Sequence, residues 1–145
     1  MLTVPALPDL ALPGAGGRFS AAVRLEVGGE ATTVHVERCA AGRLRDTYPV
    51  AAHDVEVRPD PHLHGPELSA VLGQLAAAIR VADGRCRRVV YAVDAPDPAR
   101  VAAAEEAGFR YVVDVDVAGR EHSLLVAEPG WVTATDMALE RVPGS

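Results

Sequence analysis

The sequence predicts an α+β fold built around one mixed sheet, and three observations lead to this prediction. Apolar and polar side chains alternate between residues 18 and 58, which is the period of β-strands. From residue 68 the apolar side chains recur every three or four residues, the period of an amphipathic helix. Residues 88–93 then form a continuous apolar run, typical of a strand covered on both faces. We therefore expect three antiparallel strands, then helix, strand, helix, strand and strand.

The first three strands are separated by turn residues. Residues 18–27 alternate up to a Gly-Gly dipeptide that suits a hairpin turn, and residues 32–38 return as the second strand. The third strand is expected over residues 48–58 and is strongest near its end. It stops before Pro59, because proline cannot donate a hydrogen bond to a strand ladder.

The second half contains two helices, and each has a recognisable boundary. The first helix ends near Asp83, which is followed by glycine. The second begins after Asp97, whose carboxylate can cap a helix that has proline as its first residue. The expected elements are a helix over 68–82, a strand over 88–93, a helix over 98–106, and strands over 109–117 and 121–127.

One domain is expected, flanked by two short segments. A chain of 145 residues, of which 49% are hydrophobic, is long enough to bury one core. Residues 1–17 are rich in proline and glycine and suit an extended leader. We place the domain at residues 18–130 and a C-terminal tail at residues 131–145.

Charge and apolar patterning exclude two classes of partner. The net charge is -6, whereas a nucleic-acid-binding surface needs clustered basic residues. No stretch reaches the roughly 18 apolar residues that cross a bilayer, and the start of the chain lacks the basic residues of a signal peptide. We therefore expect a cytoplasmic protein with no nucleic-acid and no membrane partner.

The chain contains no lysine and no asparagine, a composition typical of a bacterium with a GC-rich genome. The lack of lysine excludes Schiff-base chemistry on a lysine side chain. Cys39 and Cys86 do not form a pair with metal-site spacing, and thiols are normally reduced in the cytoplasm. We expect both to be small buried apolar side chains.

Several stretches of the second half carry a family motif. Residues 88–100 read RVVYAVDAPDPAR and residues 105–110 read EEAGFR, while residues 55–59 lead through a loop to the helix of residues 68–82. This succession resembles the central and closing motifs of the GNAT N-acyltransferases. The resemblance implies a GNAT-like fold without the family's usual first two helices, because two strands occupy the stretch where those helices would lie.

The resemblance also implies acetyl-CoA or another acyl-CoA as co-substrate. In the family the acyl-CoA lies along the third strand of this succession, and backbone N–H groups at a glycine-rich turn and a helix N-terminus hold its pyrophosphate. No metal is implied. The cofactor-binding residues that follow are Val55, Val57, His62, His64, Gly65, Leu68 and Asp97.

The pyrophosphate loop departs from the family's glycine pattern. Gly65 is the only glycine between residues 61 and 68. If Gly65 is the first motif glycine, Glu67 takes the second position and repels the anion. If the helix sets the register, the motif glycines fall on Pro66 and Leu68, and the proline removes an N–H donor. Both registers predict weakened pyrophosphate binding.

The catalytic groups of the family are only partly present. The tyrosine that protonates the departing CoA thiolate in many members aligns with Ala104, and Tyr91 and Tyr111 are the alternatives to it. Glu56 is the candidate general base and shares a strand face with Asp54. The opposing interpretation is that both carboxylates lie on a solvent-exposed face.

Asp60, His62 and His64 form a polar group in the same loop. A His-x-His pair can bind a metal, but a third strong ligand is not evident, and solvated loop histidines are the expectation. A protonated His62 or His64 is an alternative partner for the pyrophosphate. We expect no metal.

Two functions follow. The first is an acetyl-CoA-dependent N-acetyltransferase that acts on a small-molecule or protein amine by direct transfer in a ternary complex. The alternative is a catalytically inactive GNAT-like module that binds a ligand or a partner protein. In either case we expect a homodimer, because a sheet without its covering helices exposes apolar surface.

Overall fold

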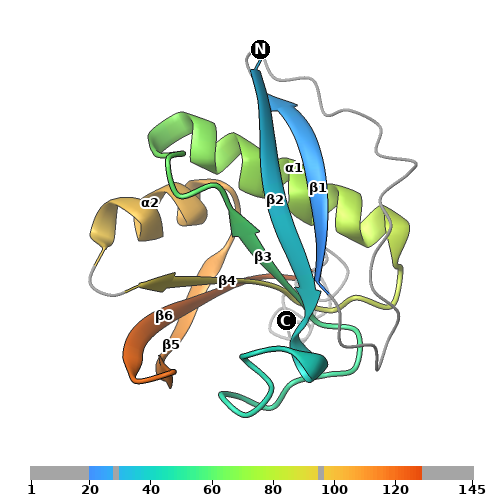
Figure 1. Ribbon diagram of the computed structural model, residues 1–145, viewed down its shortest axis with the longest axis vertical. Helices are drawn as coiled ribbons and strands as arrows, with labels where there is room; N and C mark the ends of the chain where they lie inside the picture. The colour runs from blue at the N-terminus through green and yellow to red at the C-terminus, as the bar shows by residue number, and fades with distance from the viewer. Residues whose placement is uncertain (1–19, 28–29, 95–96, 129–145) are drawn as a thin grey trace, which may run out of the picture.

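The computed structural model describes residues 20–27, 30–94 and 97–128. Within them the strands form one six-stranded sheet in the order β1-β2-β3-β4-β6-β5 (Figure 1). β3 and β4 are parallel, and the other neighbouring strands are antiparallel. The elements are β1 (Ser20–Val27), β2 (Glu30–Arg38), η1 (Cys39–Ala41), β3 (Val55–Pro59), α1 (Gly65–Ala82), β4 (Val89–Asp94), α2 (Pro98–Glu106), β5 (Arg110–Val117) and β6 (Arg120–Ala127).

The order of strands and helices confirms the fold class predicted from the sequence. The third strand is shorter than expected, because residues 48–54 form a loop instead of extending the strand. In this loop the Asp54 carboxylate accepts hydrogen bonds from the Tyr48 hydroxyl at 2.8 Å and from the Ala51 N–H at 3.0 Å. The leader at residues 1–17 and the tail at residues 131–145 lie outside the described residues.

One face of the sheet is covered by α1 and α2, which also pack against each other (Figure 1). Apolar side chains of α1 and of the central strands are buried there in the larger hydrophobic core. Asp97 caps α2 as expected, since its Oδ1 accepts the Arg100 N–H at 3.2 Å. Gly108 follows α2 with φ +98°, a conformation that favours glycine and turns the chain into β5.

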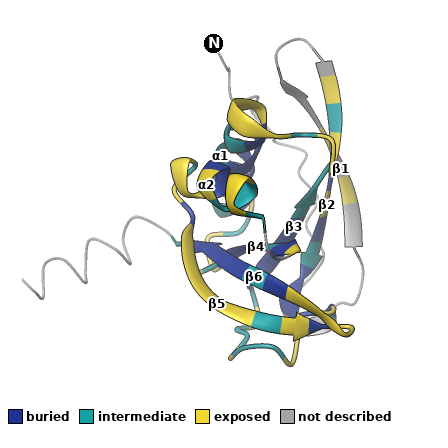
Figure 2. Ribbon diagram, turned by 90° about the vertical axis from the view of Figure 1, so that its left-hand side faces the viewer, coloured by how far each residue is buried: buried dark blue, intermediate teal, exposed yellow. Residues whose placement is uncertain are grey.

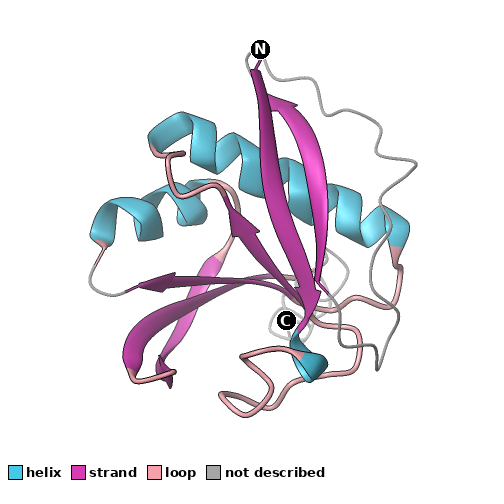
Figure 3. Cartoon of the chain, in the orientation of Figure 1, coloured by secondary structure: helices cyan, strands magenta, loops and turns pink. Residues whose placement is uncertain are grey.

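The opposite face is covered by the connection between β2 and β3, which is mostly loop (Figure 3). Leu44 of this connection is fully buried against β4 and β6, in a smaller core that also includes Cys39. A loop therefore covers part of the face that the sequence analysis expected to be bare. β5, at the end of the sheet, stays largely exposed (Figure 2).

Both cysteines are buried, as predicted. Burial raises the pKa of the Cys39 thiol to about 12 and that of the Cys86 thiol to about 11. Burial therefore keeps both thiols protonated at neutral pH, as suits small apolar side chains in the core.

Candidate functional site

β3 and β4 separate soon after they begin, and a gap opens between them (Figure 1). Their parallel ladder consists of Val55 with Val89 and Glu56 with Val90. Beyond that point β3 stays paired with β2 as far as Pro59, and β4 stays paired with β6 as far as Asp94. The carboxyl ends of two neighbouring strands thus border a gap, the usual place for a ligand in a sheet that contains parallel strands.

The backbone groups that face this gap follow from strand alternation. The Val55 N–H donates to the Arg88 carbonyl at 3.1 Å, so odd-numbered residues of β3 direct their polar backbone groups towards β4. Val57 and Pro59 are the odd residues past the last pair, and proline has no N–H. By the same alternation Ala92 of β4 directs its N–H and carbonyl into the gap. The Val57 N–H completes the ladder by donating to the Val90 carbonyl, so β3 offers the Val57 and Pro59 carbonyls as acceptors and β4 offers the Ala92 N–H as a donor.

The loop after β3 is ordered by its own polar groups. Asp60 accepts hydrogen bonds from the His62 N–H at 2.8 Å and from His62 Nδ1 at 3.0 Å, and these bonds lower the pKa of the Asp60 carboxyl. His64 Nδ1 donates to the His62 carbonyl at 3.1 Å. His62 is thus paired with a carboxylate and His64 with a carbonyl, and both rings remain exposed.

The first turn of α1 determines which backbone N–H groups the helix leaves unbonded at its N-terminus. The helix begins at Gly65, whose φ of +56° favours glycine, and proline follows. Leu68 is fully buried, and its N–H already bonds to the His64 carbonyl at 3.4 Å. The N–H groups of Gly65 and Glu67 are therefore the donors that this helix end can offer to an anion. The exposed Glu67 carboxylate lies in the same turn and opposes such an anion.

Arg100 ties α2 to the loop that follows β3. Its guanidinium donates to the Pro61 carbonyl, lies 3.4 Å from the Tyr91 hydroxyl and forms an ion pair with Asp97 at 3.2 Å. The hydrogen bond to Tyr91 is the main cause of the raised pKa of Arg100. Burial raises the pKa of Tyr91, although Arg100 partly opposes this effect. A cation and a protonated phenol therefore lie beside β4 on the helix-covered face.

Glu56 lies on the opposite face and is only 1% exposed. Arg43 holds it through Nη2 at 2.7 Å and Nε at 3.1 Å. Burial lowers the pKa of Arg43, but the hydrogen bond and charge of Glu56, together with the charges of Asp94 and Glu37, outweigh burial and the pKa is raised. Asp54 is completely buried on the same face. The solvent-face interpretation of Glu56 and Asp54 is therefore wrong, because the loop between β2 and β3 covers both carboxylates.

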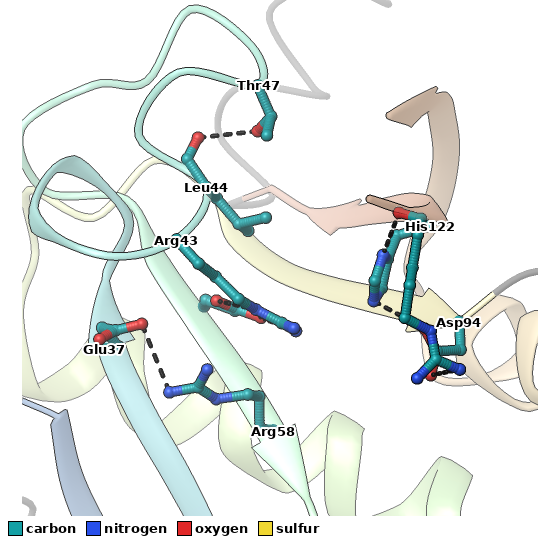
Figure 4. A network of polar contacts seen from close by, with 9 residues as sticks. Glu37, Arg43, Leu44, Thr47, Arg58, Asp94 and His122 are labelled. Carbon is teal, nitrogen blue, oxygen red and sulfur yellow. Dashed lines mark hydrogen bonds and ion pairs between the residues drawn. The ribbon is translucent and has the colours of Figure 1, made fainter. Parts of the chain in front are cut away.

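The structure brings in two residues that the sequence analysis missed, Asp94 and His122 (Figure 4). They are register partners at the open ends of β4 and β6, with Asp94 Oδ1 2.8 Å from His122 Nε2. His122 Nδ1 faces the Arg120 carbonyl at 3.0 Å, so the ring is fixed at both nitrogens. Asp94 is 55% exposed. The sequence offered one signal for this pair, namely that the polar Asp94 directly follows the buried strand of residues 88–93.

The family's general-acid position is occupied by Ala104, which is fully buried. Tyr111 is 44% exposed on β5, at the end of the sheet and away from the gap. Tyr91 is the next residue on β4 after the last β3–β4 pair. Of the two tyrosines considered from the sequence, the fold places Tyr91 at the gap.

The described residues contain no group of three or more His, Cys, Asp or Glu side chains that could hold a metal. None of the helices in the described parts of the chain is long and apolar enough to cross a membrane.

No family model matches the chain, and no curated protein sequence matches it. Solved structures do match its fold. A structure of AAC(6')-Ib in complex with paromomycin and acetyl-CoA has a TM-score of 0.66 at 11% identity, covering 87% of this chain and 70% of that one. The chain has the GNAT acetyltransferase fold.

Two further structures with this fold extend the comparison. The aminoglycoside acetyltransferase AAC(6')-Ib with coenzyme A and kanamycin has a TM-score of 0.67 at 10% identity, covering 82% of this chain and 72% of that one. A putative GnaT-family acetyltransferase from Bordetella pertussis has a TM-score of 0.51 at 25% identity, covering 70% of this chain and 60% of that one. The GNAT resemblance inferred from the sequence motifs is thereby confirmed for the fold.

Proposed function

We propose that this GNAT-fold protein binds acetyl-CoA or another acyl-CoA in the gap between β3 and β4 and transfers the acyl group to an amine. The observation that carries the proposal is the end of the β3–β4 ladder at Glu56 and Val90, which leaves backbone groups of both strands facing the gap. The solved structures with the same fold include complexes with acetyl-CoA and with coenzyme A. An extended pantetheine chain fits such a gap because it can hydrogen-bond to strand edges.

The cofactor contacts are assigned from the groups that remain available. The Val57 carbonyl and the backbone N–H and carbonyl of Ala92 are available to the pantetheine chain, whereas the N–H groups of Val55 and Val57 are bound to the carbonyls of Arg88 and Val90. The N–H groups of Gly65 and Glu67 meet the pyrophosphate, and His62 and His64 stand beside them as exposed side chains. The other two residues expected at the cofactor site support it indirectly, because Asp97 caps α2 and Leu68 packs in the core.

The acceptor amine approaches from the face that carries Glu56 and Asp94. Its nitrogen attacks the thioester carbonyl, the new C–N bond forms, and the C–S bond breaks with its electron pair leaving on the CoA sulfur. A carboxylate must take the ammonium proton. Glu56 is bound by Arg43 and nearly inaccessible, whereas Asp94 is half exposed, with His122 at its Oδ1 and Arg120 at its Oδ2 at 3.2 Å. We therefore assign the base to Asp94 and a structural role to Glu56.

The departing thiolate also needs a proton, and Ala104 cannot supply it. Tyr91 carries a hydroxyl beside the gap, and its raised pKa keeps it protonated at neutral pH. Arg100, in contact with this hydroxyl, stabilises the phenolate that forms after proton transfer. Tyr91 is the substitute acid in this proposal, and solvent is the alternative, because a thiolate leaves readily near neutral pH.

Isothermal titration calorimetry with acetyl-CoA and CoA tests the binding step, and thiol release in the presence of an amine panel tests transfer. We expect saturable binding of both cofactors and thiol release with at least one amine. Lack of any binding at about millimolar ligand, a range that detects even weak complexes, would contradict the proposal.

The second candidate is an inactive GNAT-fold module that binds a ligand or a partner protein. Pro66 and the Glu67 carboxylate at the anion-binding end of α1 favour it, as does Ala104. CoA binding without thiol release for any amine supports this second function. The homodimer expected from the sequence stays a prediction, to be checked by sedimentation.

A further inference from the structure

A cavity lies on the sheet face opposite α1 and α2, at the other end of β4 from the gap. It has a volume of about 340 Å³, within the roughly 300–1,000 Å³ typical of small-molecule sites. We call it the β5–β6 pocket. Its lining includes Tyr48, Arg88, Arg110, Val112, Val113 and Leu124.

A β-bulge shapes the floor of this pocket. Tyr111 pairs with Leu125 and Val113 pairs with Leu124, so Val112 is an extra residue in β5. In a regular strand, neighbouring side chains point to opposite faces. Here Val112 and Val113 both line the pocket and are 47% and 37% exposed. Bulges of this kind re-aim side chains and occur often beside functional sites.

Arg88 supplies a fixed cation at the wall of the pocket. Its Nη1 donates to the Pro49 carbonyl at 3.2 Å and lies 3.5 Å from Asp54 Oδ2. Its guanidinium lies 5.8 Å from the centre of the Tyr48 ring. Within the described parts of the chain, Nε and Nη2 of Arg88 have no hydrogen-bond partner. These two N–H groups can bind both oxygens of one carboxylate.

The charges around the pocket are otherwise paired. Asp54 is buried beneath Arg88, and Arg110 at the rim holds Glu128 at 2.7 Å. Val112, Val113, Leu124 and Val126 supply the apolar part of the lining. The β5–β6 pocket therefore combines an apolar floor with the guanidinium of Arg88, whose Nε and Nη2 groups can still donate hydrogen bonds.

We propose that the β5–β6 pocket binds a small organic carboxylate with an apolar body, which places its carboxylate against Arg88 and its body on Val112 and Val113. This site is separate from the acyl-CoA gap and does not depend on the proposed transferase activity.

Methyl-resolved NMR of the full chain tests the proposal, with phenylacetate as the probe and neutral phenylacetamide as the matched control ligand. We expect saturable shifts of the valine and leucine methyls that line the pocket. Phenylacetamide is expected to bind about tenfold more weakly, because it gives up the charge-assisted bonds to Arg88. Absence of saturable shifts, or equal affinity for the two ligands, overturns the proposal.

Two variants separate ligand binding from a structural role. Val112→Gln is expected to weaken phenylacetate binding about tenfold, whereas Val81→Gln, at an 87% exposed valine of α1, leaves it unchanged. Arg88→Gln is expected to remove the preference for phenylacetate over phenylacetamide while phenylacetamide still binds. Equal losses in the two valine variants, or a preference that survives Arg88→Gln, overturn the proposal. Shifts of the pocket methyls on dilution of the protein alone also overturn it, since they show that a second copy covers the site.

Discussion

Glu56 and Val90 are the last residues that pair across β3 and β4, and the gap beyond them is the feature on which the proposed function rests. Past this pair, β3 remains paired with β2, and β4 remains paired with β6. Pairing with these two outer neighbours therefore keeps β3 and β4 apart beyond Glu56 and Val90. Hydrogen bonds from a ligand to these strand edges would therefore replace no existing ladder bond.

Glu67→Gln is expected to strengthen acetyl-CoA binding about threefold, because it removes a carboxylate from the helix end that faces the pyrophosphate. Calorimetric titration of the variant measures the effect. Glu106→Gln, at the far end of α2, is the matched control and leaves the affinity unchanged. A Glu67→Gln affinity equal to or below that of the unmodified chain argues against pyrophosphate at this helix end.

Asp94→Asn is expected to lower the transfer rate at least about tenfold while acetyl-CoA affinity stays the same, because the amide cannot accept the ammonium proton. Steady-state kinetics with an accepted amine, together with a cofactor titration, separate the two effects. Glu56→Gln tests the competing assignment. If Glu56→Gln alone reduces the rate in a fully folded protein, the base has been assigned to the wrong carboxylate.

Arg43→Met is expected to destabilise the fold by about 2 kcal/mol, because it leaves the Glu56 carboxylate buried without its partner. The double variant Arg43→Met/Glu56→Leu is expected to recover part of this loss, since it removes the unpaired charge as well. Chemical unfolding measures both free energies. A double variant that is no more stable than Arg43→Met contradicts a structural role for the pair.

Asp83→Asn is expected to cost about 2 kcal/mol at neutral pH. Asp83 accepts from Arg38 at 2.8 Å and lies 2.9 Å from His53 Nδ1. Burial alone raises the pKa of Asp83, but the bonds from His53, the Arg85 N–H and Arg38 outweigh it and the pKa is lowered.

The pH dependence of this prediction follows from the direction of the shift. A carboxyl with a lowered pKa in the folded state adds stability above its unfolded pKa of about 3.9, and this contribution is lost as the pH falls through the folded value. The difference between Asp83→Asn and the unmodified chain is therefore largest above roughly pH 5 and shrinks in acid. Asp116→Asn, at an exposed position of β5, is the control. A difference independent of pH contradicts the ion-pair account.

The order of elements could be predicted from the sequence because it depends on local periodicity. The capping of α2 by Asp97 was also local and was confirmed. The burial of Glu56 was not predictable, because it depends on Arg43, which lies 13 residues earlier in a loop without periodicity.

Contacts between distant residues were the least accessible to sequence reasoning. Asp94 meets His122 only because β4 and β6 pair in one register. The bulge at Val112 is likewise invisible in the valine-rich sequence of β5, which reads as a regular strand. Strand registers are set by packing between segments, so neither feature follows from the period of its own strand.

Backbone amide NMR during titration with acetyl-CoA tests the central claim most directly, because it reports both binding and location. We predict saturable shifts of the Val57, Gly65 and Ala92 amides, which lie at the edge of the gap or at its anion-binding end. Saturable binding that leaves these three amides unmoved, or no binding at all, would contradict the central claim.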